Sequence, residues 1–194
     1  MIFLSDGHDN VSYGARYRKA KYQFVREHNL VMKFNNIIED YFKLRKVPYI
    51  RVNADYRLVD ERFKFSSKVL SLRYKVSYIN QLCEYFKTPI AIETHFNAGG
   101  GTGFEVLYYE KSKISKRLAN LLITNLEDFL NFLHLKNRGA KPVKNKFFVK
   151  GTVCPALIIE PLFLDKDFNY YEDEKNFEML AVAWGHAIEK IYRG

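Results

Sequence analysis

Four short stretches, far apart along the chain, hold the residue types that hydrolytic metal chemistry requires. They are Ser5-Asp6-Gly7-His8, Arg26-Glu27-His28-Asn29, Glu93-Thr94-His95-Phe96-Asn97-Ala98 and Ile158-Ile159-Glu160-Pro161. Two histidines and one carboxylate form a recurring catalytic zinc set, which leaves a fourth coordination position for water. A further carboxylate beside that water can move its proton. These residue types indicate a mononuclear zinc hydrolase site suited to metal-assisted amide hydrolysis.

His8 and His95 each follow a segment that we expect to be a strand. Gly7 is expected to let the backbone turn tightly, so that the His8 imidazole points into a cleft. In the strand leading to His95, alternation puts Glu93 and His95 on one face. Buried polar atoms need partners, and a metal would satisfy His95. Glu93 either orients a ligand histidine or pairs with a buried basic group, and both readings stay open.

Glu160 is an ionisable residue inside a nearly continuous apolar run, from Ala156 to Leu164. Desolvation there would raise its pKa toward the working pH, which suits a general base and acid. The alternative is a buried salt bridge. The three other histidines lack such a setting and are interpreted as non-ligands: His28, His134 and His186. His28 adjoins Glu27 but would point about 100° around a helix from it.

Strands and helices alternate in the pattern of the sequence. Helical spacing of apolar residues predicts helices over about 25–44, 68–86, 113–133 and 174–191, and strands are expected near 1–4, 49–52, 90–95, 104–109, 147–149 and 156–159. This order predicts one α/β domain over residues 1–194, with a mostly parallel sheet of about six strands flanked by helices. Ligands gather beyond the carboxyl ends of such strands, where His8, His95 and Glu160 fall. Glu27 lies near the start of the first helix, which faces the same edge.

Composition supports a folded domain. The chain has 194 residues, of which 47% are hydrophobic and 27% charged, and this balance argues against disorder. The first residues lack the features of a secretory signal, and no apolar run reaches the roughly 18 residues that a membrane helix needs. We therefore expect no export signal and no membrane insertion. Cys83 and Cys154 have no CxxC spacing and are interpreted as core residues.

The chain is basic, with a formal net charge of +9. Two clusters stand out, and their members are Arg16, Arg18, Lys19, Lys21 and Arg26, then Lys136, Arg138, Lys141, Lys144, Lys146 and Lys150. Such patches attract nucleic acid, anionic lipid or acidic cell-wall polymers, although a solvated basic surface has the same appearance. No nucleic-acid module signature accompanies them. The glycines at 99–103 lack a GK[ST] ending, so we expect no nucleotide site there.

Several motifs occur in the order seen in a known enzyme family. They are Gly7-His8, Glu27, His95-Phe96-Asn97-Ala98, Gly103-Phe104-Glu105-Val106 and Ile159-Glu160. With Asn137-Arg138-Gly139, Lys141 and Cys154-Pro155-Ala156, they give a chain that resembles the zinc-dependent N-acetylmuramoyl-L-alanine amidases of type 3. The resemblance covers roughly residues 2–190. It departs after His8, where family members often have Gly-Gly and this chain has Asp9 to Tyr13.

The resemblance implies that Zn²⁺ is bound by His8, Glu27 and His95, and that Glu160 is catalytic. It implies hydrolysis of the amide between the lactyl group of N-acetylmuramic acid and L-alanine in peptidoglycan. Asn97 and Arg138 are candidate substrate-binding residues. Arg138 would anchor a substrate carboxylate or the developing oxyanion, or else be a plain surface arginine.

The absence of a signal and of wall-binding repeats suggests an enzyme with no separate cell-wall-binding domain. It would be made in the host cytoplasm and act on the bacterial cell wall, as phage endolysins do. Peptidoglycan is the expected partner, with anionic wall polymers a further candidate. The alternatives are a cell-separation or sporulation amidase that has lost its signal, and a zinc peptidase, although no HExxH helix is present. Outside enzymes, a basic nucleic-acid-binding protein and an inactive wall-binding module remain open.

Overall fold

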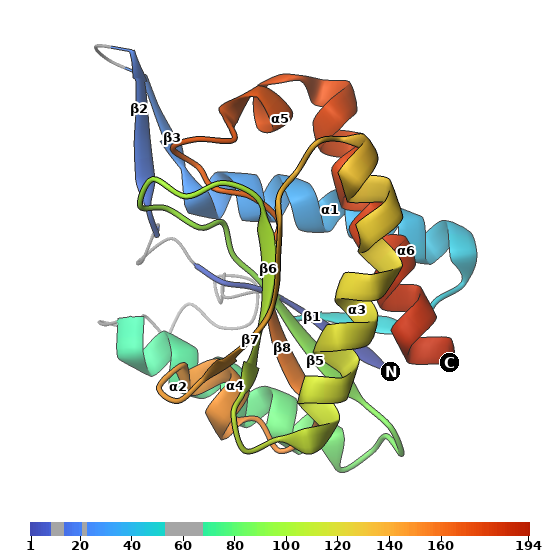
Figure 1. Cartoon of the computed structure of the whole chain (residues 1–194). Coiled ribbons are helices and arrows are strands. Elements are labelled where there is room, and N and C mark those ends of the chain that lie inside the picture. The colour runs from blue at the N-terminus through green and yellow to red at the C-terminus, as the bar shows by residue number, and fades with distance from the viewer. Residues whose placement is uncertain (9–13, 21–22, 53–67) are drawn as a thin grey trace.

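A six-stranded sheet forms the centre of the protein (Figure 1). The computed structural model describes residues 1–8, 14–20, 23–52 and 68–194. The strands are β1 (Ile2–Asp6), β4 (Tyr49–Val52), β5 (Ile90–Thr94), β6 (Phe104–Tyr109), β7 (Asn137–Val143) and β8 (Ala156–Glu160), in the order β4-β1-β5-β8-β6-β7. β4, β1, β5 and β8 are parallel, whereas β6 pairs antiparallel with β8. The predicted mostly parallel sheet is confirmed.

Helices cover both faces of this sheet (Figure 1). One face carries α1 (Glu27–Arg45), α3 (Lys113–Phe132) and α6 (Glu174–Arg193), and the other carries α2 (Lys68–Cys83) and α4 (Phe147–Gly151). The short α5 (Phe168–Glu172) precedes α6. Among the described residues, no helix combines the length and the apolar character that crossing a membrane requires.

Alternation along the strands divides the core in two. In β1, Ile2 and Leu4 belong to the larger core, on the side of α1, α3 and α6. Phe3 belongs to the smaller core, on the side of α2 and α4. β5 and β8 follow the same rule, so both faces of each strand are apolar, as expected for a parallel sheet buried on two sides. Cys83 and Cys154 are partly buried free thiols that pack against the smaller core.

One predicted strand is wrong. Residues 147–149 begin the helix α4, in which Phe148 and Val149 are buried while Phe147 remains 41% exposed. Such a short apolar run does not distinguish a strand from a buried helical turn. The strand of the six-stranded sheet that was not predicted is β7, which lies in the second basic cluster of the sequence. It is an edge strand, where Gly and Pro are tolerated and an alternating pattern is not required.

A β-hairpin that the sequence did not predict leads into the first helix. β2 (Arg16–Ala20) and β3 (Gln23–Arg26) form a separate antiparallel sheet that projects beyond α1 (Figure 1). The short α5 was not predicted either, and the remaining helices and strands agree with the expected ranges to within a few residues.

One edge of the large sheet collects polar side chains. β1, β5 and β8 end at this edge, and β6 and β7 begin there, because β6 runs against β8. Residues that are far apart in sequence are thereby brought together at the place where open α/β sheets bind ligands.

Candidate metal centre

Three donor atoms form a nearly equilateral triangle at this edge. His8 Nε2 lies 3.0 Å from Glu27 Oε1, His95 Nδ1 lies 3.1 Å from the same oxygen, and the two nitrogens are 3.2 Å apart. Ligands about 2.0–2.1 Å from a tetrahedral zinc ion lie about 3.3 Å from one another. Two imidazoles and a carboxylate at these separations fit one such ion. Within the described ranges, these residues also form a cluster suited to a metal ion.

Strand pairing and a helix start bring these side chains together. His8 and His95 follow neighbouring parallel strands in which Asp6 pairs with Thr94. Glu27 is the first residue of α1, and backbone N–H groups hold both of its oxygens. Phe96 N–H donates to Oε1 (3.1 Å) and Ala15 N–H donates to Oε2 (2.8 Å). The carboxylate is therefore oriented by the backbone before any ion is considered.

Two glycines allow this close approach. A Cβ atom at Gly7 would lie 2.4 Å from the His95 ring. Gly7 has no positive φ, so the tight turn expected from the sequence does not explain why glycine is needed here. The lack of a side chain explains it, because no Cβ atom would fit. Gly14 has φ +72°, and a Cβ there would lie 2.4 Å from Glu27 Oε2 and 2.5 Å from the His8 ring. Asp9 to Tyr13, where the sequence departs from the family pattern, lie outside the described residues.

Charge is concentrated around the triangle. Burial favours a higher pKa for Glu27, but hydrogen bonds and charge from His8 and His95 outweigh it and hold the pKa well below its ordinary value. Burial favours a lower pKa for His95, yet its hydrogen bonds to Glu27 and Glu93 raise the pKa to about 10. Both shifts show that negative charge of the carboxylates favours a positive charge at this position, which also suits a divalent cation.

Glu93 makes both of the contacts that the sequence left open, one to a buried basic group and one to a histidine. Its Oε1 accepts a hydrogen bond from the buried Lys75 ammonium group at 2.6 Å, and its Oε2 lies 3.2 Å from His95 Nε2. His95 therefore turns one ring nitrogen to the triangle and the other to a carboxylate. Burial favours a higher pKa for Glu93, but the charge of Lys75 outweighs it, so the pKa is lowered.

The other histidines lie outside the triangle. His28 is buried, and its Nδ1 donates a hydrogen bond to the carbonyl oxygen of His8 at 3.1 Å. It therefore contacts the backbone of the neighbouring loop, not a donor atom. His186 contacts the Tyr41 hydroxyl at 3.0 Å, and His134 has a left-handed backbone with φ 56°.

Glu160 ends β8 and lines the same pocket as the triangle. The pocket has a volume of about 410 Å³ and also contains His8, Glu27, His95 and Asn97. Glu160 Oε2 is buried and has no hydrogen-bond partner among the residues that the structure describes. Burial, together with the charge of Glu27, raises its pKa to about 7 in the protein without an ion. This oxygen therefore does not form the buried salt bridge that the sequence left open, within the described part of the chain.

Asn97 and Arg138 meet at Glu105, a carboxylate that the sequence placed in a family motif but gave no role. Glu105 accepts hydrogen bonds from Asn97 Nδ2 (3.0 Å), Arg138 Nε (2.6 Å) and Lys141 Nζ (2.5 Å). Glu105 pairs with Glu160 across β6 and β8, so both side chains project from the same face. The Arg138 guanidinium also lies 4.8 Å from the centre of the Phe163 ring. Arg138 is thus a partly buried, fixed cation and not a freely solvated one.

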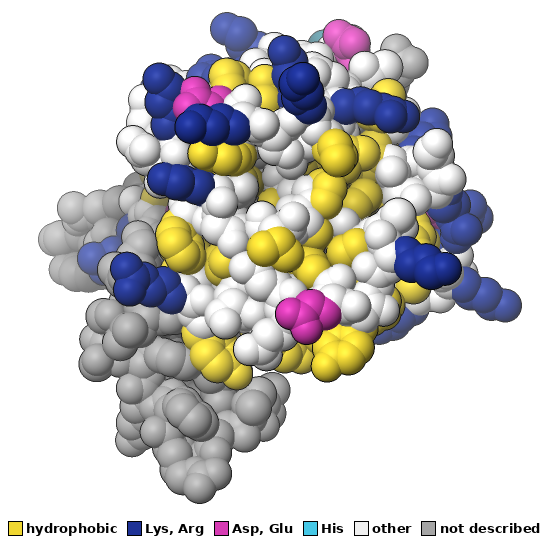
Figure 2. Space-filling model, turned by 90° about the horizontal axis from the view of Figure 1, so that it is seen from below, with side chains coloured by type: hydrophobic (Ala, Val, Ile, Leu, Met, Phe, Trp, Pro, Cys, Tyr) yellow, Lys and Arg dark blue, Asp and Glu magenta, His cyan; other side chains and the backbone are white. Residues whose placement is uncertain are grey.

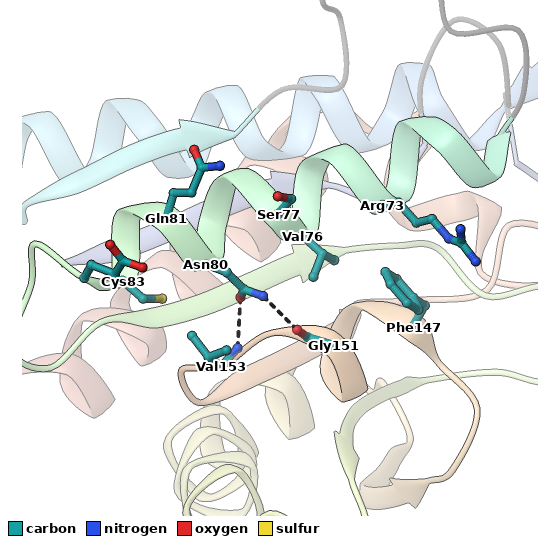
Figure 3. Close-up of a pocket in the computed structure, with 10 residues that line it drawn as sticks. Arg73, Val76, Ser77, Asn80, Gln81, Cys83, Phe147, Gly151 and Val153 are labelled. Atoms are coloured by element: carbon teal, nitrogen blue, oxygen red, sulfur yellow. Dashed lines mark hydrogen bonds between the residues drawn. The ribbon is translucent and has the colours of Figure 1, made fainter.

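A second pocket of about 490 Å³ lies between α2 and α4. Figure 3 shows Asn80 among the residues that line it. Asn80 Nδ2 donates a hydrogen bond to the carbonyl oxygen of Gly151, and its Oδ1 accepts one from the N–H group of Val153. Phe147 lines both pockets, so they lie side by side. Figure 2 views the molecule from this side and shows apolar side chains near the middle, with Lys and Arg mostly around the edge.

One pocket of this two-sided α/β sheet thus holds a His-Glu-His cluster that could bind a metal ion, together with a buried carboxylate. This is the combination of groups that a hydrolase site uses. The chain belongs to the N-acetylmuramoyl-L-alanine amidase family, whose model matches residues 2–190. It is therefore a member of a family of enzymes that hydrolyse amide bonds.

Individual relatives agree with this family. The chain is 28% identical over 123 residues to the N-acetylmuramoyl-L-alanine amidase CwlM of Bacillus licheniformis, and the match covers 63% of this chain and 46% of that protein. The fold matches the amidase AmiC2 of Nostoc punctiforme with a TM-score of 0.76 at 17% identity, over 100% of this chain and 98% of that one. It also matches the catalytic domain of CD27L, an endolysin targeting Clostridia difficile, with a TM-score of 0.71 at 23% identity, over 96% and 95% of the two chains.

Proposed function

We propose that this chain is a zinc-dependent N-acetylmuramoyl-L-alanine amidase that cleaves the amide bond between N-acetylmuramic acid and the L-alanine of the stem peptide. The observation that carries this proposal is the triangle of His8 Nε2, Glu27 Oε1 and His95 Nδ1, with edges of 3.0–3.2 Å. Beside it lies Glu160, whose buried Oε2 has no hydrogen-bond partner among the described residues. Membership of the amidase family supports the bond that is cut.

His8, Glu27 and His95 would hold the zinc ion. When bound, the ion supplies Lewis-acid chemistry, which acidifies a water molecule and polarises a carbonyl group. Glu160 then accepts the proton of the attacking water and returns it to the departing amine of L-alanine. A raised pKa suits both halves of this exchange, because the carboxylate must take up a proton and then release it.

Asn97 and Arg138 would bind substrate at the rim of the pocket. Glu105 holds both of them, together with Lys141, at the edge where Glu160 ends β8. Arg138 provides donors in a fixed fork, which fits a carboxylate of the stem peptide or the developing oxyanion.

We further propose that the enzyme is of the endolysin type, made in the host cytoplasm and released to degrade the cell wall. The net charge of +9 supports attraction to an anionic envelope. Purified protein added to susceptible cells should reduce the turbidity of the suspension. Separation of cell chains without loss of turbidity would instead favour a cell-separation amidase.

Digestion of purified sacculi tests the reaction itself. Mass spectrometry of the products should reveal stem peptides with new L-alanine amino termini and glycan strands of unchanged length. Cuts inside the stem peptide would indicate a peptidase, and new reducing ends would indicate a glycosidase. Binding to sacculi without any new termini would identify an inactive wall-binding module. Chelation should abolish product release and added zinc should restore it.

A further inference from the structure

Lys75 of α2 has a buried ammonium group with two partners on neighbouring strands. Its side chain is 2% exposed, and it donates to Glu93 Oε1 at 2.6 Å and to the carbonyl oxygen of Asp6 at 2.5 Å. Asp6 belongs to β1 and Glu93 to β5. A buried charge is costly unless it is paired and hydrogen-bonded, so these contacts fix where the ammonium group lies.

Both partners lead directly to the metal centre. Asp6 lies two residues before His8, and Glu93 lies two residues before His95. The second oxygen of Glu93 contacts His95 Nε2 at 3.2 Å, while His95 Nδ1 faces the triangle. One ammonium group therefore contacts the ends of both strands that carry the candidate histidine ligands.

Other charged groups near these strand ends have partners of their own. The Asp6 carboxylate points toward α1, where it accepts from Asn35 Nδ2 at 2.7 Å, and it also pairs with Arg51 at 2.6 Å. Only the Asp6 backbone carbonyl turns to Lys75. The chain from Lys75 through Glu93 to His95 is thus separate from the polar cluster under α1.

We propose that Lys75 is a positioning residue for the metal centre: it anchors Glu93, which fixes the His95 ring, and it ties that strand end to the one that carries His8. The proposal rests on the metal site of the proposed function and deepens it. Partners behind a metal-bound histidine orient its ring, and their loss costs about 10–100-fold in metal affinity. Lys75 lies 18 residues before Glu93 in the sequence, and their contact links α2 to the strand end that carries His95.

The test compares four variants in metal-free form. Lys75→Met removes the charge at similar length, Glu93→Gln removes its partner, and the double variant removes both. Lys116→Met is the control, because Lys116 is exposed on α3. Zinc affinity is measured by competition with a chromophoric chelator, and the melting temperature of the metal-free protein is measured alongside it.

Lys75→Met should bind zinc about 10–100-fold more weakly than wild type. It should also melt at a lower temperature, because it leaves the Glu93 carboxylate buried without its cation. The double variant leaves no unpaired buried charge, so its melting temperature should recover toward wild type while its zinc affinity stays low. Lys116→Met should match wild type in both measurements.

Two results would overturn the inference. One is unchanged zinc affinity in Lys75→Met, and the other is recovery of zinc affinity together with stability in the double variant, which would mean that the pair is merely structural. A wild-type protein that binds no zinc would overturn the proposed metal site as well. The wild-type titration therefore distinguishes failure of this inference from failure of the proposed function.

Discussion

Buried carboxylates in this protein differ in what their oxygen atoms contact. Asp6, Glu93 and Glu105 each have a cation within 2.6 Å, and such pairs are what burial of a charge requires. Glu160 Oε2 is buried with no partner in the described part of the chain. An acid left in this state is destabilising, and such positions concentrate at sites where a proton must move.

Replacing Glu160 by Gln should separate metal binding from catalysis. The amide has nearly the same shape but cannot accept the proton of the attacking water. Release of soluble muropeptides from sacculi should fall by about 10²–10⁴-fold, the usual size of a general base effect. Zinc content, measured by elemental analysis, should remain at the wild-type level. Near-normal turnover in this variant would show that another group moves the proton.

The same variant should reveal the cost of burying the carboxylate. The pKa of Glu160 is about 7 in the folded chain against an ordinary value of 4.5, so between these values the folded protein binds more protons than the unfolded one. The stability contributed by this group is therefore lost as pH rises from 4.5 to 7. Metal-free Glu160→Gln should melt above wild type at pH 8, and the difference should disappear near pH 4. A difference independent of pH would contradict the raised pKa.

At the scale of elements, strand ends were the most predictable part of the site. Long runs with clear periodicity gave α1, α2, α3, α6 and five of the sheet strands. His8, Glu27, His95 and Glu160 were predicted to meet because the carboxyl ends of parallel strands share an edge. The structure brings all four into one pocket.

Elements that depend on tertiary contacts were missed. The start of α4 was predicted as a strand, because three apolar residues are too few to show helical or strand spacing. β7 was not predicted, because this polar edge strand lacks the alternation of apolar residues. Lys75 was missed for a related reason, whereas Glu105 was noted as part of a motif but its partners were not predicted. A lysine within a helix normally reaches solvent, and only the packing of α2 on the sheet makes Lys75 a buried partner of Glu93.

Gly14, which precedes β2, lies against two of the three candidate metal ligands. Gly14→Ala places a Cβ against Glu27 and His8, whereas Gly139→Ala has open space although its φ of +77° is similar to +72°. Both variants should lose about 1 kcal/mol of stability from the left-handed backbone. Gly14→Ala alone should also lose zinc affinity, measured by chelator competition. Equal zinc affinity in the two variants would mean that the contacts of Gly14 with Glu27 and His8 do not matter for metal binding.

At the scale of the whole molecule, charge is the property that acts at long range. The net charge is +9, and Lys and Arg side chains surround the face shown in Figure 2. The segment from Lys136 to Lys150 has no acidic residue and runs along β7 to α4, and its residues 145–148 line the pocket that holds the His-Glu-His triangle. Attraction by such a patch raises the rate of encounter with an anionic polymer and weakens with added salt.

Charge reversal in this segment should therefore slow attack on whole cell walls. Lys136→Glu with Lys150→Glu lowers the net charge from +9 to +5 at two exposed positions, and Lys116→Glu with Lys175→Glu does the same on α3 and α6. The first pair lies in the segment that supplies Asn145 and Lys146 to the pocket lining, and the second pair does not. The first pair should therefore lose more activity on sacculi at low salt, and the loss should shrink as salt screens the field. Both pairs should cleave a small soluble muropeptide at the wild-type rate. Equal losses on sacculi for the two pairs would mean that total charge matters and its position does not.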